Sequence, residues 1–161
     1  MRTTFRTRRK VHKDRLFKEG CKRAVIKILS IDDEAEILKC FHDALTMEGY
    51  AFESTTDPEE GLRLLRERDD FDLVLLDVKM PVKNGFEIYQ EMRTFRELPV
   101  LFVTAYPNSF DPKKDDVVKM WEEEFTDGTT DILYKPFELD TLYNKVLGLV
   151  GPANESATES N

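Results

Sequence analysis

The 161-residue sequence has little cysteine and no long apolar segment. Cys21 and Cys40 form no Cys-x-x-Cys pair and have no histidine at ligand spacing, so the sequence predicts neither a disulfide framework nor a zinc site. No run of about eighteen apolar residues could span a bilayer, and no apolar signal segment follows the positive charges of the N-terminus. We therefore expect a cytoplasmic protein with reduced thiols and no membrane span.

Positive charge is concentrated at one end of the chain. Residues 1–23 contain ten Lys and Arg residues against Asp14 and Glu19, a net charge of +8, whereas the whole chain carries −8. The remaining residues therefore carry −16 and repel nucleic acid, which we expect to bind only weakly, through residues 1–23. This basic leader has three interpretations: a solvated disordered tail, an arm that binds polyanions, or translated sequence upstream of the true start.

Apolar periodicity predicts an alternation of strands and helices. Short apolar runs rich in β-branched residues predict five strands, at residues 25–31, 50–54, 71–77, 99–104 and 131–134. Apolar residues at helical spacing predict five helices, at residues 37–48, 56–65, 86–95, 117–125 and 139–149. Strands that alternate with helices indicate right-handed crossovers and an α/β fold with a parallel sheet covered on both faces. The flavodoxin-like, doubly wound order 2-1-3-4-5 is the one we expect.

The pattern divides the chain into three parts. We expect a basic, disordered leader at 1–23, one domain at 24–150, and a disordered tail at 151–161. The length suits a single core, and an apolar content of 40% is enough to build it. The tail consists of small and polar residues that have little apolar surface to bury.

Residues that can carry chemistry follow the predicted strands. Asp32 and Asp33 follow the first strand and Asp77 ends the third, while Thr104 ends the fourth and Lys135 follows the fifth. Because the carboxyl ends of parallel strands meet at one edge of a sheet, we expect these side chains to converge. Three carboxylates would repel one another there unless a cation lay among them. Ligands that are all oxygen suit Mg²⁺ better than Zn²⁺.

This set of residues predicts phosphoryl transfer. If Mg²⁺ and Lys135 held the phosphoryl oxygens and Thr104 donated a hydrogen bond, Asp77 could attack phosphorus and form an acyl phosphate. Each residue also has a structural interpretation on its own, since Asp32 or Asp33 could cap a helix, Thr104 could stabilise a turn, and Lys135 could be solvated. The combination favours the chemical interpretation.

Four short motifs stand at the strand ends. They are Ile31-Asp32-Asp33-Glu34, then Leu75-Leu76-Asp77-Val78-Lys79-Met80-Pro81 followed by Asn84-Gly85, then Val103-Thr104-Ala105, and last Tyr134-Lys135-Pro136-Phe137. Each motif is a weak signal alone. In this order they resemble, over about residues 24–149, the receiver domain of two-component response regulators, in the CheY-like superfamily.

The resemblance implies a specific reaction and a specific metal site. Asp77 would accept a phosphoryl group from the phosphohistidine of a histidine kinase or phosphotransfer protein, with Thr104 and Lys135 assisting. Asp32, Asp33, Asp77 and the backbone carbonyl of Lys79 would bind Mg²⁺ as the cofactor. The resemblance also implies a cis peptide bond between Lys135 and the proline that follows it.

On this interpretation the chain is a single-domain response regulator rather than an enzyme. It would catalyse only its own phosphorylation and dephosphorylation, and it would signal through contacts with a protein target that the sequence does not identify. A homodimer through the fourth helix, the fifth strand and the fifth helix is compatible with the resemblance.

Two features depart from the receiver pattern. Receivers carry Tyr or Phe three residues before the lysine, and Ile132 stands there, so the usual aromatic switch linked to Thr104 is not predicted. The segment between Ala105 and Gly128 is several residues longer than usual. We therefore expect a reshaped fourth helix.

Two further residues bear on the lifetime of the phosphorylated state. The resemblance places Lys79 and Tyr106 beside the path of the water that would hydrolyse phosphoryl-Asp77. Neither side chain is a carboxamide that could orient this water, and Tyr106 is bulky enough to cover the approach. We expect a long-lived phosphorylated state.

Two other functions account for part of the pattern. A phosphatase of the haloacid dehalogenase type also combines an aspartyl nucleophile, Mg²⁺ and an α/β fold. It requires a second Asp two residues after the nucleophile, where this chain has Lys79. A pseudo-receiver that only binds partners and is not phosphorylated is disfavoured by the complete acidic set.

Overall fold

The computed structural model describes residues 25–105 and 128–153. These residues form five strands and four helices, namely β1 (Lys27–Ile31), α2 (Ala35–Met47), β2 (Ala51–Thr55), α3 (Pro58–Glu67), β3 (Leu73–Asp77), α4 (Gly85–Arg93), β4 (Val100–Ala105), β5 (Thr130–Lys135) and α6 (Leu139–Val150). The predicted basic leader, the predicted helix at 117–125 and Tyr106 lie outside the described residues. No helix within the described ranges is both long and apolar enough to cross a membrane.

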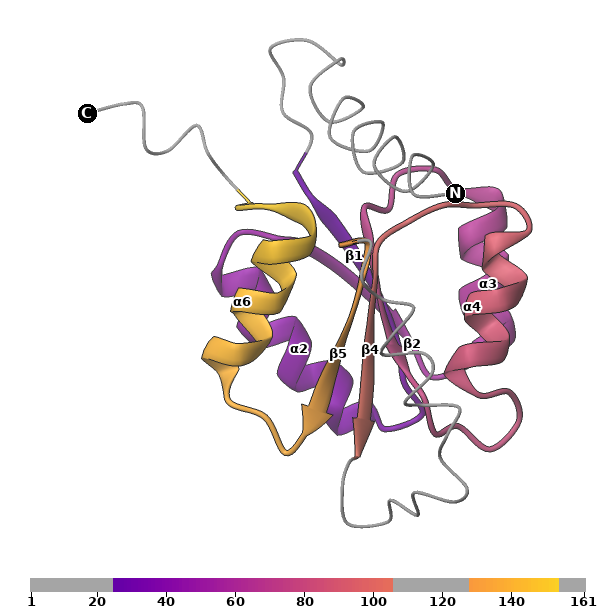
Figure 1. The fold of residues 1–161 in the computed structure, drawn as a ribbon, viewed down its shortest axis with the longest axis horizontal. Coiled ribbons are helices and arrows are strands. Elements are labelled where there is room, and N and C mark those ends of the chain that lie inside the picture. The colour runs from indigo at the N-terminus through magenta and orange to yellow at the C-terminus, as the bar shows by residue number, and fades with distance from the viewer. Residues whose placement is uncertain (1–24, 106–127, 154–161) are drawn as a thin grey trace, which may run out of the picture.

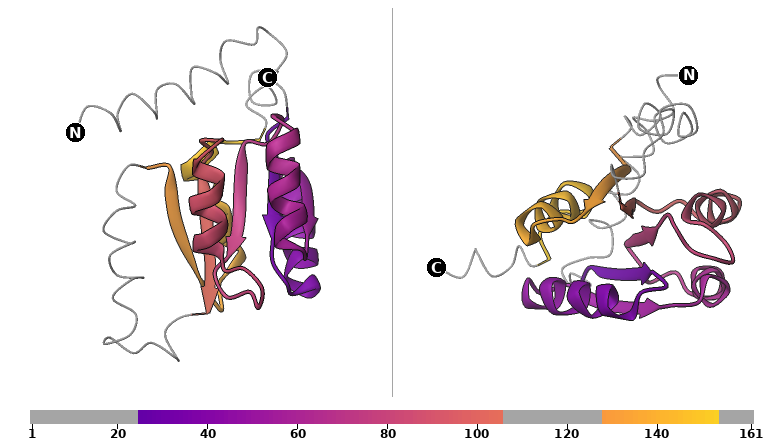
Figure 2. Two further views of the ribbon diagram at one scale, coloured as in Figure 1. Left: turned by 90° about the vertical axis from the view of Figure 1, so that its right-hand side faces the viewer. Right: turned by 90° about the horizontal axis from the view of Figure 1, so that it is seen from below.

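The strands form one parallel sheet in the order β2-β1-β3-β4-β5, which confirms the predicted doubly wound topology. Helices α2 and α6 cover one face of the sheet and α3 and α4 cover the other (Figure 1), so that the molecule has three layers when it is viewed along the strands (Figure 2). All strand carboxyl ends therefore lie at one edge of the sheet, which Figure 1 shows at the bottom, at the arrowheads of β4 and β5.

Each face of the sheet has its own apolar core. The side chains of β3 alternate between the two cores: Leu73 and Leu75 pack toward α2 and α6, and Val74 and Leu76 pack on the opposite side. Because β3 lies in the middle of the sheet and is covered on both faces, all five of its residues are buried. A central parallel strand reads as a continuous apolar run for this reason.

The amphipathic helices close the two cores. In α2 the buried positions are Leu38, Phe41 and Leu45, and in α6 they are Leu142, Val146 and Val150. Spacings of three and four residues place each set on one side of its helix, facing the sheet. Helix α3 starts where Asp57 accepts a hydrogen bond from the Glu59 backbone N–H at 3.0 Å, with Pro58 as its first residue.

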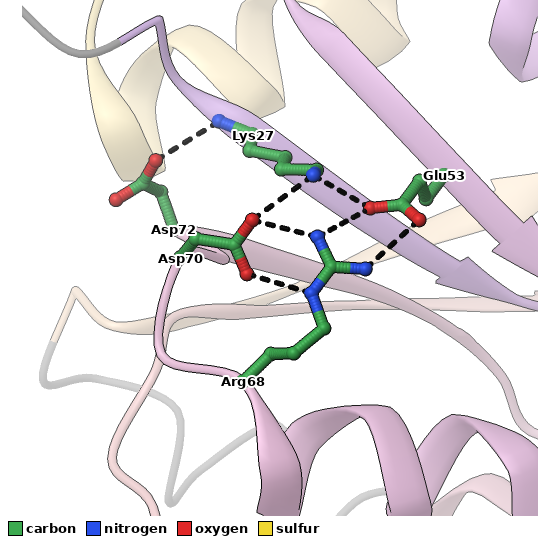
Figure 3. A network of polar contacts seen from close by, with 5 residues as sticks. All are labelled: Lys27, Glu53, Arg68, Asp70 and Asp72. Carbon is green, nitrogen blue, oxygen red and sulfur yellow. Dashed lines mark hydrogen bonds and ion pairs between the residues drawn. The ribbon is translucent and has the colours of Figure 1, made fainter.

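The amino ends of the strands are held by an ionic network (Figure 3). The ammonium of Lys27 lies 2.7 Å from Glu53 and 3.0 Å from Asp70, and the guanidinium of Arg68 lies 2.9 Å and 2.6 Å from the same two carboxylates. Asp72 accepts a hydrogen bond from the Lys27 backbone N–H at 2.9 Å. The network joins β1, edge strand β2, the end of α3 and the start of β3. A charged residue on the edge strand, such as Glu53, also discourages the addition of another strand.

The segment after α6 packs against the domain. Tyr50 donates a hydrogen bond from its hydroxyl to the Gly151 carbonyl at 2.8 Å, and Ala153 contacts the core beside α2 and α6. Residues 151–153 are half-buried. The packed part of the chain thus includes the first three residues of the segment that we expected to be a disordered tail, while residues 154–161 lie outside the described ranges.

Candidate functional site

Three carboxylates meet at the carboxyl edge of the sheet. Asp32 and Asp33 follow β1, and Asp77 is the last residue of β3. A carboxylate oxygen from each of the three lies within 4.8 Å of the others. Strands β1 and β3 are hydrogen-bonded neighbours, so their ends deliver the three side chains to one place. The structure therefore brings together the acidic residues that the sequence singled out.

Burial makes this cluster electrostatically costly. Asp32 and Asp77 are only 1% and 4% exposed, whereas Asp33 is exposed to solvent. Burial, and after it the negative charge of Asp32, raises the pKa of Asp77 to about 7. Burial also raises the pKa of Asp32, although a hydrogen bond from the Glu34 backbone N–H at 2.9 Å opposes this shift. Two buried carboxylates with raised pKa values beside an exposed third form a set of hard oxygen donors that fits a divalent cation.

Lys135, the last residue of β5, supplies positive charge to the site. Its ammonium lies 3.3 Å from Asp32 and 3.9 Å from Asp77. Burial alone would lower the pKa of Lys135, but the neighbouring carboxylates, Asp77 first, together raise it, so the side chain stays charged. The Lys135-Pro136 bond is cis, as the resemblance implies.

Glu34 belongs to the site although sequence reasoning gave it no role. Its carboxylate lies 3.6 Å from the Lys135 ammonium, and it does not cap α2, where Glu34 occupies the N-cap position. The only signal in the sequence was its place as the third acid in a run that follows a buried strand. A single ammonium thus serves three carboxylates, those of Asp32, Glu34 and Asp77.

Thr104 lies at the same edge of the sheet. It is on β4, the strand between β3, which ends at Asp77, and β5, which ends at Lys135. In the sheet register Asp77 pairs with Val103, so Thr104 stands one residue beyond it, and Thr104 is 8% exposed. Ile132 pairs with Phe102 and is buried in the core beside α3 and α4. The residue paired with Thr104 in the register is Tyr134 of β5, which is aromatic but does not stand at the position that the receiver pattern uses.

The loop that follows Asp77 is fixed by a glycine. A Cβ atom on Gly85 would lie 2.3 Å from the Asp77 carbonyl oxygen and 3.1 Å from Val78 Cα, so only glycine allows α4 to begin this close to the acidic cluster. The Gly85 N–H donates to the Val78 carbonyl at 3.1 Å, and Asn84 caps α4. At the near end of the loop, the Lys79 N–H donates to Asp77 Oδ1 at 3.3 Å, which brings the Lys79 backbone to the pocket.

The chain matches one protein family over most of its length. Residues 28–147 match the response regulator receiver domain. The chain is 32% identical over 135 residues to the transcriptional regulatory protein CpxR of Escherichia coli, a match that covers 84% of this chain and 53% of that protein. The chain spans about half the length of the curated relatives that it matches.

Solved structures show the same fold. The chemotaxis protein CheY4 of Vibrio cholerae is 30% identical, with a TM-score of 0.60 over 78% of this chain and 99% of that one. The response regulator TrrA of Thermotoga maritima is 28% identical, with a TM-score of 0.62 over 77% of this chain and 98% of that one. The TrrA structure was determined in complex with Mg²⁺ and BeF.

Substitutions of Gly85 by alanine and of Gly148 by alanine are predicted to change the stability of the protein in opposite directions. Gly85→Ala would force the Asp77 backbone or the start of α4 to shift, and we expect a loss of about 1–3 kcal/mol in the free energy of unfolding. Gly148 is the matched control because it lies on the exposed side of α6 with nothing within 4 Å of an added Cβ. Gly148→Ala is expected to stabilise the protein by about 0.5–1 kcal/mol. Urea denaturation measures both, and equal effects would contradict the close approach at Asp77.

Proposed function

The chain belongs to the response regulator receiver domain family, and from this premise we propose that Asp77 accepts a phosphoryl group in a reaction that depends on Mg²⁺. The observation that carries the proposal is the convergence of Asp77 with two further carboxylates and with the Lys135 ammonium at 3.9 Å. A carboxylate needs neighbouring positive charge to meet an anionic phosphoryl group. Lys135 supplies a fixed positive charge here, and the oxygen donors suit a bound cation as well.

The residues that would hold Mg²⁺ are Asp32, Asp33, Asp77 and the backbone carbonyl of Lys79. When bound, the ion would neutralise charge on the phosphoryl oxygens. Two observations support this assignment: carboxylate oxygens of the three acids lie within 4.8 Å of one another, and Asp33 remains open to solvent. The Lys79 N–H bond to Asp77 places the Lys79 backbone beside them.

In the transfer itself, an Asp77 carboxylate oxygen would form a bond to phosphorus as the bond between phosphorus and the donor imidazole nitrogen breaks. The imidazole would leave with the electron pair of that bond, and the product would be an acyl phosphate on Asp77. Lys135 would exchange part of its contact with Asp32 for a phosphoryl oxygen. The Thr104 hydroxyl, at the end of the neighbouring strand, would donate to a second oxygen. A histidine kinase or a phosphotransfer protein is the proposed donor.

The phosphorylated state is proposed to be long-lived. Lys79 is exposed, follows Asp77 by two residues, and has no amide group that could orient a water molecule for hydrolysis. Its ammonium could instead contact a phosphoryl oxygen, which would favour the phosphorylated form. Tyr106, the other residue expected beside the hydrolytic path, lies outside the described residues.

We propose that the domain signals in the cytoplasm through protein contacts. The face proposed for a homodimer includes β5 and α6, while its third element, the helix expected at 117–125, lies outside the described ranges. The rival phosphatase function has no support at residue 79, because a lysine cannot replace the general acid that this reaction needs.

Incubation with acetyl phosphate and Mg²⁺ tests the phosphoacceptor directly. We expect the intact mass to increase by one phosphoryl group, peptide mapping to place it on Asp77, and the product to persist for minutes. Asp77→Asn is expected to abolish labelling. The matched control is Asp43→Asn, because Asp43 is exposed on α2 and pairs only with its neighbour His42, at 3.2 Å, in the described part of the chain. Undiminished labelling of Asp77→Asn would sink the assignment.

Thermal unfolding tests whether the acidic cluster binds Mg²⁺. Mg²⁺ relieves repulsion only in the folded state, so the melting temperature is expected to rise, with about 2.7 kcal/mol of added stability at a free concentration 100 times the dissociation constant. Without Mg²⁺, Asp77→Asn is expected to be more stable than the parent by on the order of 1 kcal/mol, because it removes a buried charge. Asp43→Asn serves as the control and is expected to match the parent in both measurements. A parent that does not respond to Mg²⁺, together with an unchanged Asp77→Asn, would contradict an acidic metal site.

A further inference from the structure

A set of ion pairs connects the loop after Asp77 to both helices on one face of the sheet. Lys83 lies in this loop, residues 78–84, and its ammonium is 2.9 Å from Glu59 and 2.8 Å from Glu91. Arg66 of α3 also contacts Glu91. We refer to Lys83, Glu59, Glu91 and Arg66 as the Lys83 clamp. None of its members is among the residues proposed to contact metal or phosphoryl group.

The clamp connects the loop to two helices that also pack on the same apolar core. Glu59 is in the first turn of α3, and Glu91 is near the end of α4. Lys83 therefore connects the loop to the start of α3 and to the end of α4. Its ammonium has two carboxylate partners, and its side chain is only 23% exposed. The hydrogen bonds with Glu91 and Glu59 raise the pKa of Lys83, so its ammonium stays charged at neutral pH.

The loop is anchored at several points besides Lys83. Next to Asp77, the Val78 N–H donates to the Val103 carbonyl at 3.0 Å, and the Lys79 N–H donates to Asp77 Oδ1 at 3.3 Å, which is long for a hydrogen bond. Met80 is buried in the core and anchors the middle of the loop. Asn84 and Gly85 fix the start of α4. The path of the loop between Met80 and Asn84 is the part that Lys83 restrains.

We propose that Lys83 is a positioning residue that holds the loop so that the Lys79 backbone stays at the acidic pocket, and that the clamp thereby sets the Mg²⁺ affinity of the site. This inference rests on the proposed function. Exposed ion pairs contribute little to stability, so the clamp acts mainly on geometry. Residues that orient metal ligands from outside the coordination sphere commonly change metal affinity when they are replaced.

Amide shifts in a Mg²⁺ titration followed by ¹⁵N NMR give the dissociation constant without any phosphoryl transfer. Lys83→Met is expected to raise this constant about threefold to tenfold, at or below the range known for residues outside the coordination sphere. Lys83→Arg keeps the charge and both partners and is expected to restore affinity to within about twofold of the parent. Glu91→Gln is expected to weaken binding in the same direction, and its effect is not expected to add to that of Lys83→Met, because both break the same contact.

Arg63→Met is the matched structural control. Arg63 also pairs with two carboxylates, Glu60 at 2.6 Å and Glu67 at 2.5 Å, but all three residues belong to α3. Its loss is expected to leave the Mg²⁺ dissociation constant unchanged.

The outcomes separate this inference from the proposed function. A parent that binds Mg²⁺ with Lys83→Met and Glu91→Gln both within twofold of it would overturn the clamp alone. Equal weakening by Arg63→Met would also overturn it, because the effect would then follow from loss of helix stability. A parent that shows no Mg²⁺ binding would overturn the proposed metal site, and the clamp with it.

Discussion

Repulsion among the carboxylates of Asp32, Asp33 and Asp77 is the constraint on which the rest of the structure depends. Two of these groups are buried, and the Lys135 ammonium lies within 4 Å of both. Such an arrangement is unfavourable in isolation and persists only because its surroundings are rigid. The rigidity comes from β1 and β3, whose apolar side chains are buried in both cores and hold the carboxylates in place.

The pKa values of the carboxyl groups shift in opposite directions at the amino ends and at the carboxyl ends of the strands. At the amino edge, Glu53 and Asp70 each contact both Lys27 and Arg68, and the neighbouring cations lower the pKa of both carboxyl groups (Figure 3). At the carboxyl edge, burial raises the pKa of Asp77 instead. At the amino edge each of these carboxylates is paired with two cations, whereas at the carboxyl edge the buried Asp32 and Asp77 share the Lys135 ammonium, and this difference supports the proposal that the acidic cluster binds a cation.

Most of the fold and the centre of the site could be predicted because both follow from local patterns. Asp32 and Asp77 were identifiable because each follows an apolar run that forms a strand. Side-chain contacts between distant segments left no such pattern. Lys83 meets Glu59 and Glu91 only after α3 and α4 pack, and no periodicity signals this. Phe95 has helical spacing with α4 but is 37% exposed, because the helix ends at Arg93.

A crystal structure of the chain grown with Mg²⁺ and beryllofluoride, which mimics a phosphoryl group, tests the central claim most directly. We predict that beryllium is bonded to an Asp77 carboxylate oxygen and that Mg²⁺ is coordinated by Asp32, Asp33, Asp77 and the Lys79 carbonyl. The Lys135 ammonium is predicted to contact a fluorine in exchange for part of its contact with Asp32. A structure in which beryllofluoride at full occupancy is bound to another residue, or in which Mg²⁺ is bound away from the three carboxylates, would contradict this claim.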